Sequence, residues 1–85
     1  IKIETMQDTV HARFHKTILR LSEEMHYREI CRKADIDVRN LYRNRKLAGD
    51  KVPAEWLSAM VTEFGVSAHW LLTGEGSMFG KPSRN

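Results

Sequence analysis

The chain has 85 residues, of which 41% are hydrophobic and 29% are charged, a composition typical of one small globular domain. A chain of this length buries only about 60–65% of its unfolded surface, so it has no room for a deep catalytic cleft between domains. Its longest apolar runs are three residues, which predicts neither a membrane-spanning helix nor a secretory signal. Cys31 is the single cysteine, which excludes an intramolecular disulfide and a cysteine-rich zinc cluster. We therefore expect a cytoplasmic protein.

The positive charge is concentrated in the middle of the chain. The formal net charge is +3, and residues 28–51 contain eight Lys or Arg against four acids, whereas the other 61 residues contain six bases and seven acids. Concentrated basic charge suits a polyanionic partner, because neutralised phosphates release their condensed counterions. On charge alone, however, a solvated basic face is the commoner explanation.

The spacing of apolar residues predicts two helices in the first part of the chain. Intervals of three and four predict a helix over about residues 6–25, after a loose capping box at residues 5–8. A second helix of about two turns follows from Tyr27. Its small apolar face consists of Ile30, Cys31 and Ala34.

A third helix is predicted from Val38 to about Lys46. Asp37 is a good N-cap for it, because its carboxylate can accept free backbone N–H groups of the first turn. Leu41 is expected to point inward. Residues 48–50, Ala-Gly-Asp, are expected to end the helix.

Two further helices complete the pattern. Pro53 suits the first position of the fourth helix, and Gly65 is expected to close it. Ser67 caps a short last helix over 68–73. Three residues of this helix are expected to pack on the core: Trp70, Leu71 and Leu72. The chain shows no alternating strand pattern, so the predicted fold is all-α with five helices.

The second and third helices together have the pattern of a helix-turn-helix, two short helices separated by a few residues. Ile30 and Cys31 supply the bulky and the small apolar residue that such a unit needs where its helices cross closely. Asp35 falls at the turn, where a left-handed backbone is common and Asp tolerates it better than most residues. Ile36 is expected to fill the core after the turn.

The outward face of the third helix is basic. Arg39, Arg43 and Lys46 recur at i, i+4 and i+7, so they form one positive ridge. Such a ridge fits the major groove of DNA, where Arg can bind guanine O6 and N7 with two hydrogen bonds.

The run from Ile30 to Asn44, ICRKADIDVRNLYRN, resembles the helix-turn-helix of the phage CI-type repressors. The segment VPAEWL at 52–57 and the more specific ending GVSAHWLLTGEG at 65–76 are similar to the helices that follow in the same group. The resemblance covers about residues 10–78. It implies a compact five-helix, lambda-repressor-like domain that represses by docking on duplex operator DNA, usually as a homodimer on an inverted repeat.

The resemblance also implies roles for individual residues. Val38, Arg39 and Arg43 occupy the places that face bases. Positions that usually contact phosphates are held by Tyr27, Arg28, Arg45 and Lys46. From its residue type, Asn40 is a candidate for reading adenine, with helix capping as the alternative. Tyr42 is a candidate for contacting a phosphate or sugar, with packing against the first helix as the alternative.

Two residues depart from the family pattern. Asp35 replaces the commoner glycine of the turn. Asn44 stands where an apolar or aromatic residue is common, so we expect Leu47 to take over the buried role. Longer repressors of this type also carry a C-terminal domain that dimerises tightly. This chain is therefore expected to be either an excised DNA-binding domain or a short regulator, with a flexible N-terminus (1–5), the domain (6–78) and a tail or linker (79–85).

Several other residues carry simpler interpretations. His11 and His15 are spaced as two zinc ligands on a helix, but no third and fourth ligand is evident, so no metal site is predicted. Trp56 and Trp70 lie on apolar stripes and are expected in the core rather than stacked on single-stranded bases. Cys31 is expected to be buried and inert.

The predicted function is that of a sequence-specific, double-stranded DNA-binding transcriptional regulator, a phage or prophage repressor of the bacterial cytoplasm and nucleoid. The alternative is a protein-interaction module, such as an antitoxin or an adaptor, with weak or no DNA binding. An enzyme is not predicted, because the carboxylates are scattered and no nucleophile–base pair or cofactor loop stands out. No cofactor is expected.

Overall fold

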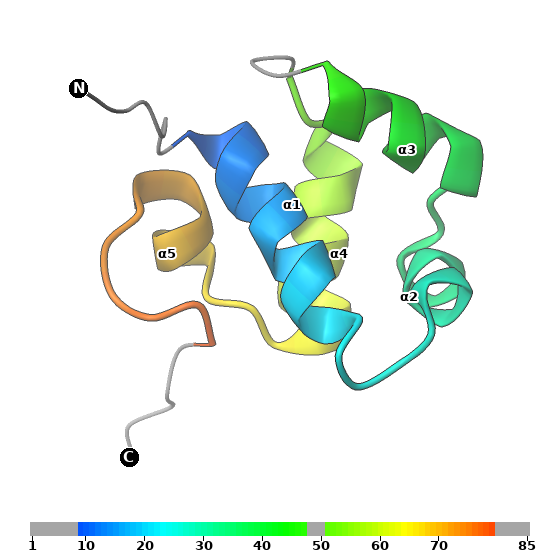
Figure 1. The fold of residues 1–85 in the computed structure, drawn as a ribbon. Helices are drawn as coiled ribbons and strands as arrows, with labels where there is room; N and C mark the ends of the chain where they lie inside the picture. Colours follow the sequence, from blue (N-terminus) through cyan, green and yellow to red (C-terminus); the bar gives the residue numbers. More distant parts are fainter. Residues whose placement is uncertain (1–8, 48–50, 80–85) are drawn as a thin grey trace, which may run out of the picture.

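The computed structural model describes residues 9–47 and 51–79, which form five α-helices and no strand (Figure 1). The helices are α1 (Val10–Leu21), α2 (Tyr27–Ala34), α3 (Val38–Lys46), α4 (Ala54–Phe64) and α5 (Ala68–Thr73). The predicted all-α fold with five helices is confirmed. Within the described ranges, no helix is long and apolar enough to cross a membrane.

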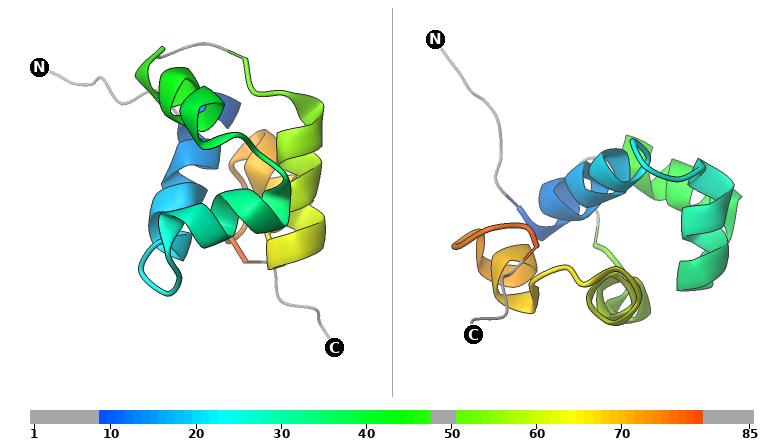
Figure 2. Two further views of the ribbon diagram at one scale, coloured as in Figure 1. Left: turned by 90° about the vertical axis from the view of Figure 1, so that its right-hand side faces the viewer. Right: turned by 90° about the horizontal axis from the view of Figure 1, so that it is seen from below.

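The two views of Figure 2 and the view of Figure 1 agree on the arrangement of the helices. α1 and α4 lie in the centre, α5 lies on one side of them, and α2 and α3 lie on the other side. The closest helix packing joins α2 with α4, α1 with α5, and α1 with α2. A buried Arg13 strengthens the contact between α1 and α5, because its Nε donates a hydrogen bond to the carbonyl of Leu71 at 2.9 Å.

Each helix contributes at least one large, fully buried apolar side chain to a single core. These side chains are Phe14, Ile30, Leu41, Met60 and Leu71. Burial of each contributes about 1.5–3 kcal/mol relative to exposure. Both tryptophans belong to this core, as predicted: Trp70 is buried, and the partly buried Trp56 stacks on Phe14 with ring centroids 5.8 Å apart.

Cys31 is buried beneath the crossing of α2 with its neighbours. Burial raises the pKa of its thiol, and the nearby Asp37 carboxylate raises it further. The thiol therefore stays protonated at neutral pH, as expected for a cysteine that serves as a small core residue.

The caps predicted from the sequence are confirmed at three helix ends. The Asp37 carboxylate accepts hydrogen bonds from the backbone N–H groups of Arg39 and Asn40, at 2.8 and 3.4 Å. The Ser67 hydroxyl accepts from the Trp70 N–H at 3.1 Å. Gly65 ends α4 with a left-handed backbone (φ 71°), which glycine adopts without a steric cost.

Three helix ends differ from the prediction. α1 begins at Val10 rather than at about residue 6, because Thr9 is extended and caps the helix, its hydroxyl accepting a hydrogen bond from the Ala12 N–H at 3.1 Å. α1 ends at Leu21 rather than Met25, because a turn follows in which the N–H groups of both Glu24 and Met25 bond to the Leu21 carbonyl. Met25 still packs against the core. Its apolar side chain therefore reflects burial in the turn rather than continuation of the helix. Pro53 is the N-cap of α4 rather than its first helical residue.

Leu72 was expected in the core, and this expectation is wrong: its side chain is 56% exposed. α5 has only six residues, and its neighbours Trp70 and Leu71 take the inward directions. Met78 and Phe79 pack against the core after α5 instead. The predictions for residues 1–8, 48–50 and 80–85 lie outside the described residues.

Asp35 holds the turn between α2 and α3 in a left-handed conformation (φ 58°, ψ 47°), as predicted. It is the one residue other than glycine with a positive φ in the described part of the chain. The turn is closed by the Ile36 N–H, which donates to the Cys31 carbonyl at 2.9 Å. The backbone at Asp35 therefore sets the direction in which α3 leaves α2.

Substituting Asp35 should reveal this conformational requirement. We expect Asp35→Val to lower the free energy of unfolding by about 1–2 kcal/mol, because a β-branched side chain is strained at positive φ. Asp35→Gly should stay within about 0.5 kcal/mol of wild type, because glycine adopts this region freely but loses more chain entropy on folding. Urea unfolding followed by circular dichroism measures both, and equal stability of the two variants would contradict the assignment.

Candidate nucleic-acid interface

The inner face of α3 is anchored by few residues. Ile36 (5% exposed) fills the core just before the helix, and Leu41 (0% exposed) holds its middle. Leu41 and Asn44 are the buried residues of α3. The rest of this nine-residue helix faces solvent.

The outward face of α3 carries the ridge predicted from the sequence. Arg39, Arg43 and Lys46 are all exposed and follow one side of the helix. No carboxylate in residues 9–47 or 51–79 lies at salt-bridge distance from any of them, whereas Arg20 and Arg32 are paired with acids on their own helices. The positive charge of the ridge is therefore available to a partner.

The two remaining candidates for reading bases lie on opposite flanks of this ridge. Val38 is 40% exposed at the first position of α3. Asn40 is also exposed, and it borders a depression that is lined by Asp37 and Trp56 among others. The capping bonds of α3 are supplied by the Asp37 carboxylate. The Asn40 side chain is thus exposed to solvent next to the Asp37 cap.

Tyr42 is an exposed aromatic ring with two cations beside it. The ring is 48% exposed, and its centroid lies 5.3 Å from Arg45 Cζ and 4.8 Å from Lys46 Nζ. Both distances fit cation–π contacts. The three side chains form one polar and aromatic group at the C-terminal half of α3.

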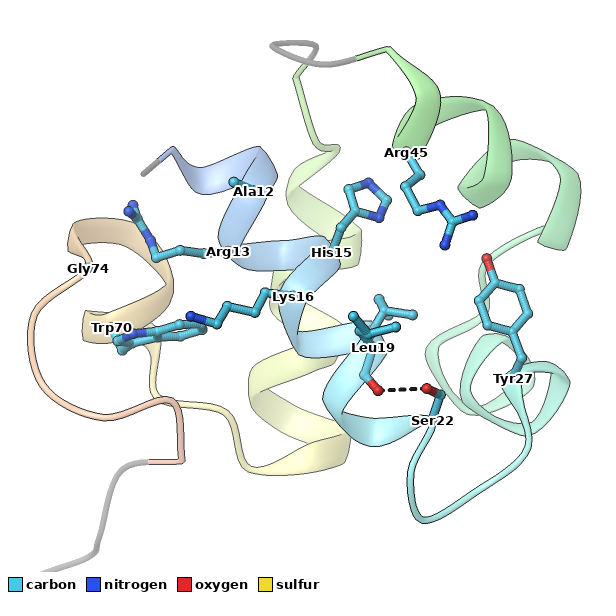
Figure 3. A pocket seen from close by; sticks show the side chains of 11 residues that line it. Ala12, Arg13, His15, Lys16, Leu19, Ser22, Tyr27, Arg45, Trp70 and Gly74 are labelled. Carbon is cyan, nitrogen blue, oxygen red and sulfur yellow. Dashed lines mark hydrogen bonds between the residues drawn. The ribbon is translucent and has the colours of Figure 1, made fainter. Parts of the chain in front are cut away.

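Tyr27 joins this group from the start of α2. In Figure 3 its hydroxyl and the Arg45 guanidinium point toward one another. Burial raises the pKa of Tyr27, so its phenol keeps its proton at neutral pH and can donate a hydrogen bond. Arg28 follows it and is exposed, and the N-cap here is His26, whose Nδ1 accepts from the Arg28 N–H at 3.1 Å.

A groove of about 710 Å³ runs along the solvent face of α1 next to this group (Figure 3). Leu19, which is 63% exposed, lies along it, and Trp70 lines it from α5. Among the described residues that line it, the charged ones are Arg13, Lys16 and Arg45, and none is acidic. The positive surface therefore continues from α3 onto α1.

The expectation for the end of α3 is wrong. Leu47 is 50% exposed, and Asn44 itself is buried, with 8% exposure. Hydrogen bonds to α1 and to the following connection allow this polar side chain to be buried. The sequence contains both sides of this contact, a polar residue at an inward position of α3 and the pair His11 and His15 on α1, but nothing in it shows that they pair.

Both histidines contact Asn44. His11 Nε2 lies 2.7 Å from the Asn44 backbone oxygen, and His15 Nε2 lies 2.7 Å from its Oδ1. Among the residues that the structure describes, no group of three or more His, Cys, Asp or Glu side chains could hold a metal ion.

Comparison with known proteins identifies the family. Residues 28–79 match the model of the bacteriophage CI repressor helix-turn-helix domain. Comparisons with curated proteins and with solved structures gave no significant match. The family match covers α2, α3, α4 and α5, so it includes both helices of the turn and the Trp-Leu-Leu-Thr-Gly-Glu-Gly ending. The chain belongs to the bacteriophage CI repressor helix-turn-helix domain family.

Proposed function

We propose that this protein is a sequence-specific, double-stranded DNA-binding transcriptional regulator, a phage or prophage repressor that inserts α3 into the major groove. The observation that carries the proposal is the ridge of Arg39, Arg43 and Lys46, exposed and free of acidic partners in the described chain. Membership of the CI repressor family supports the same function.

The proposed base-reading residues project from the first six positions of α3. Arg39 and Arg43 are one turn apart and suit guanine, whose O6 and N7 accept two hydrogen bonds from a guanidinium. Val38 suits the methyl group of thymine. Asn40 suits adenine, which pairs with an amide through N6 and N7. Its place on the flank near Asp37 limits it to the edge of the recognised site.

The proposed phosphate contacts surround this surface. They are Tyr27, Arg28, Tyr42, Arg45 and Lys46. Tyr27 and Arg28 occupy the first two positions of α2, where the positive end of the helix dipole also favours an anion. Arg45 and Lys46 both contact the Tyr42 ring, so these three side chains lie together at the C-terminal end of the ridge.

We further propose that the protein binds an inverted-repeat operator as a homodimer, in the cytoplasm and nucleoid of a bacterial host. One α3 helix covers only a few base pairs, so a two-fold partner would double the recognised sequence. Exposed apolar side chains outside the ridge, such as Leu19 on α1 and Leu72 on α5, offer area for a weak contact between subunits.

Selection of bound duplexes from a random pool, repeated at two salt concentrations, tests the function. We expect enrichment of a short motif whose two halves lie about 34 Å apart, or a multiple of that, on one face of the duplex. The logarithm of affinity should fall with the logarithm of salt concentration, at about −0.9 per neutralised phosphate. Undetectable duplex binding at low salt would favour the protein-interaction module instead.

Two substitutions separate the base-reading role from the phosphate role. Arg43→Ala should weaken binding to the selected duplex by about 1–3 kcal/mol and relax the preference at one base pair. Lys46→Ala should weaken binding to all duplexes alike and reduce the salt dependence by about one unit. Arg20→Ala is the matched control, since Arg20 lies at the far end of α1 beside Glu23 and Glu24. Equal losses on every sequence for both Arg43→Ala and Lys46→Ala would contradict the assigned roles.

A further inference from the structure

Asn44 connects α3 to two other parts of the molecule through three hydrogen bonds. Its backbone oxygen bonds to His11 Nε2 and its Oδ1 to His15 Nε2, both at 2.7 Å. Its Nδ2 donates to the Lys51 carbonyl at 2.8 Å, in the connection before α4. We call His11, His15 and Asn44 the polar clasp. It links the recognition helix both to α1 and to the chain that leads into α4.

The chemistry of the clasp fixes the direction of each hydrogen bond. Because the amide nitrogen of Asn44 donates to a carbonyl, its Oδ1 is the acceptor toward His15. His15 must then donate from Nε2, and its neutral ring carries the lone pair on Nδ1. That Nδ1 is buried and has no hydrogen-bond partner in the described structure. His11 likewise donates from Nε2, because a backbone carbonyl only accepts.

α3 packs less closely on the other helices than they pack on one another. The closest helix pairings in the described chain are α2 with α4, α1 with α5 and α1 with α2, and none includes α3. Leu41 and Asn44 are its buried residues, three positions apart on one face. Leu41 supplies an apolar contact that permits rotation. The hydrogen bonds of Asn44 are directional, so they define how the helix is turned about that contact.

We propose that Asn44 is a positioning residue for DNA recognition, and that its bonds to His11 and His15 set the angle at which α3 presents Arg39 and Arg43 to the bases. The inference rests on the proposed function. It adds a residue that faces away from DNA to those that determine sequence specificity.

The specificity of duplex binding tests the proposal. The measured quantity is the ratio of affinities for the selected duplex and for an unrelated duplex of equal length, at neutral pH and with folding checked by circular dichroism. Asn44→Leu fills the space with the apolar residue type common here but removes the side-chain bonds. We expect the ratio to fall about ten-fold, the size of one lost base contact, with unchanged affinity for the unrelated duplex.

Two substitutions of His15 provide an internal comparison if Asn44→Leu does not fold. His15→Leu removes the donor and should lower the ratio as Asn44→Leu does. His15→Gln should recover it, because the Gln amide nitrogen can occupy the place of Nε2 and donate to Asn44. An unchanged ratio in both Leu variants overturns the positioning role alone. A wild-type protein with no preference for any duplex overturns the proposed function, and the positioning role with it.

The surroundings of His15 oppose its protonation. Charged or titratable groups near it are His11 and Lys16 on α1, Tyr27 on α2 and Arg45 on α3, and no carboxylate lines the groove among residues 9–47 and 51–79. Burial lowers the pKa of His15 from its ordinary 6.5; its bond to Asn44 opposes this, while His11 and Arg45 lower it further. A proton on Nδ1 would also be buried without an acceptor.

Stability should therefore depend on pH through His15. Around and below pH 6.5 the unfolded chain binds a proton at this residue more readily than the folded chain, so the urea midpoint should fall as the pH is lowered from 7.5 to 5. His15→Gln should show a smaller fall, because glutamine does not titrate. An equal fall in His15→Gln and wild type would overturn the neutral, Nε2-donating state of His15 on which the clasp depends.

Discussion

The proposed interface depends on the burial of α3 along one narrow face. Leu41 and Asn44 occupy that face, three residues apart, and every basic residue of the helix is left on the solvent side. A helix with apolar residues all round would have been buried between its neighbours, and one with none would have no fixed orientation. One buried leucine and one hydrogen-bonded amide are enough to orient a surface of four cations.

The turn before α3 contributes a second constraint, and it comes from two acids. Asp35 accepts the left-handed conformation that reverses the chain, and Asp37 caps the first turn of the new helix. Both carboxylates lie at the start of α3, and Arg43, Arg45 and Lys46 lie in its last turn. This order is favourable for the helix dipole at both ends. The cations that a phosphate would contact therefore also stabilise the helix that presents them.

Features that depend on neighbouring residues could be predicted from the sequence, and features that depend on distant partners could not. The cap at Asp37, the left-handed turn at Asp35 and the stop at Gly65 follow from local backbone rules, so the structure agrees with them. The burial of Asn44 depends on His11 and His15, which lie 33 and 29 residues away. No periodicity contains that information, and the sequence pattern favoured Leu47 only because it is apolar.

A polar anchor on a recognition helix has a physical consequence that an apolar anchor lacks. Apolar contacts tolerate small rotations, because dispersion and burial change little while the surfaces stay in contact. A buried amide that loses its partners pays the full cost of desolvation, about 1–3 kcal/mol, so small departures from the bonded geometry are disfavoured. Side chains at the outer edge of a helix move further than its axis when the helix rotates, and the guanidinium groups of Arg39 and Arg43 lie at that edge. The hydrogen bonds of Asn44 therefore restrain α3 on its buried face. This restraint limits movement most at the exposed guanidinium groups.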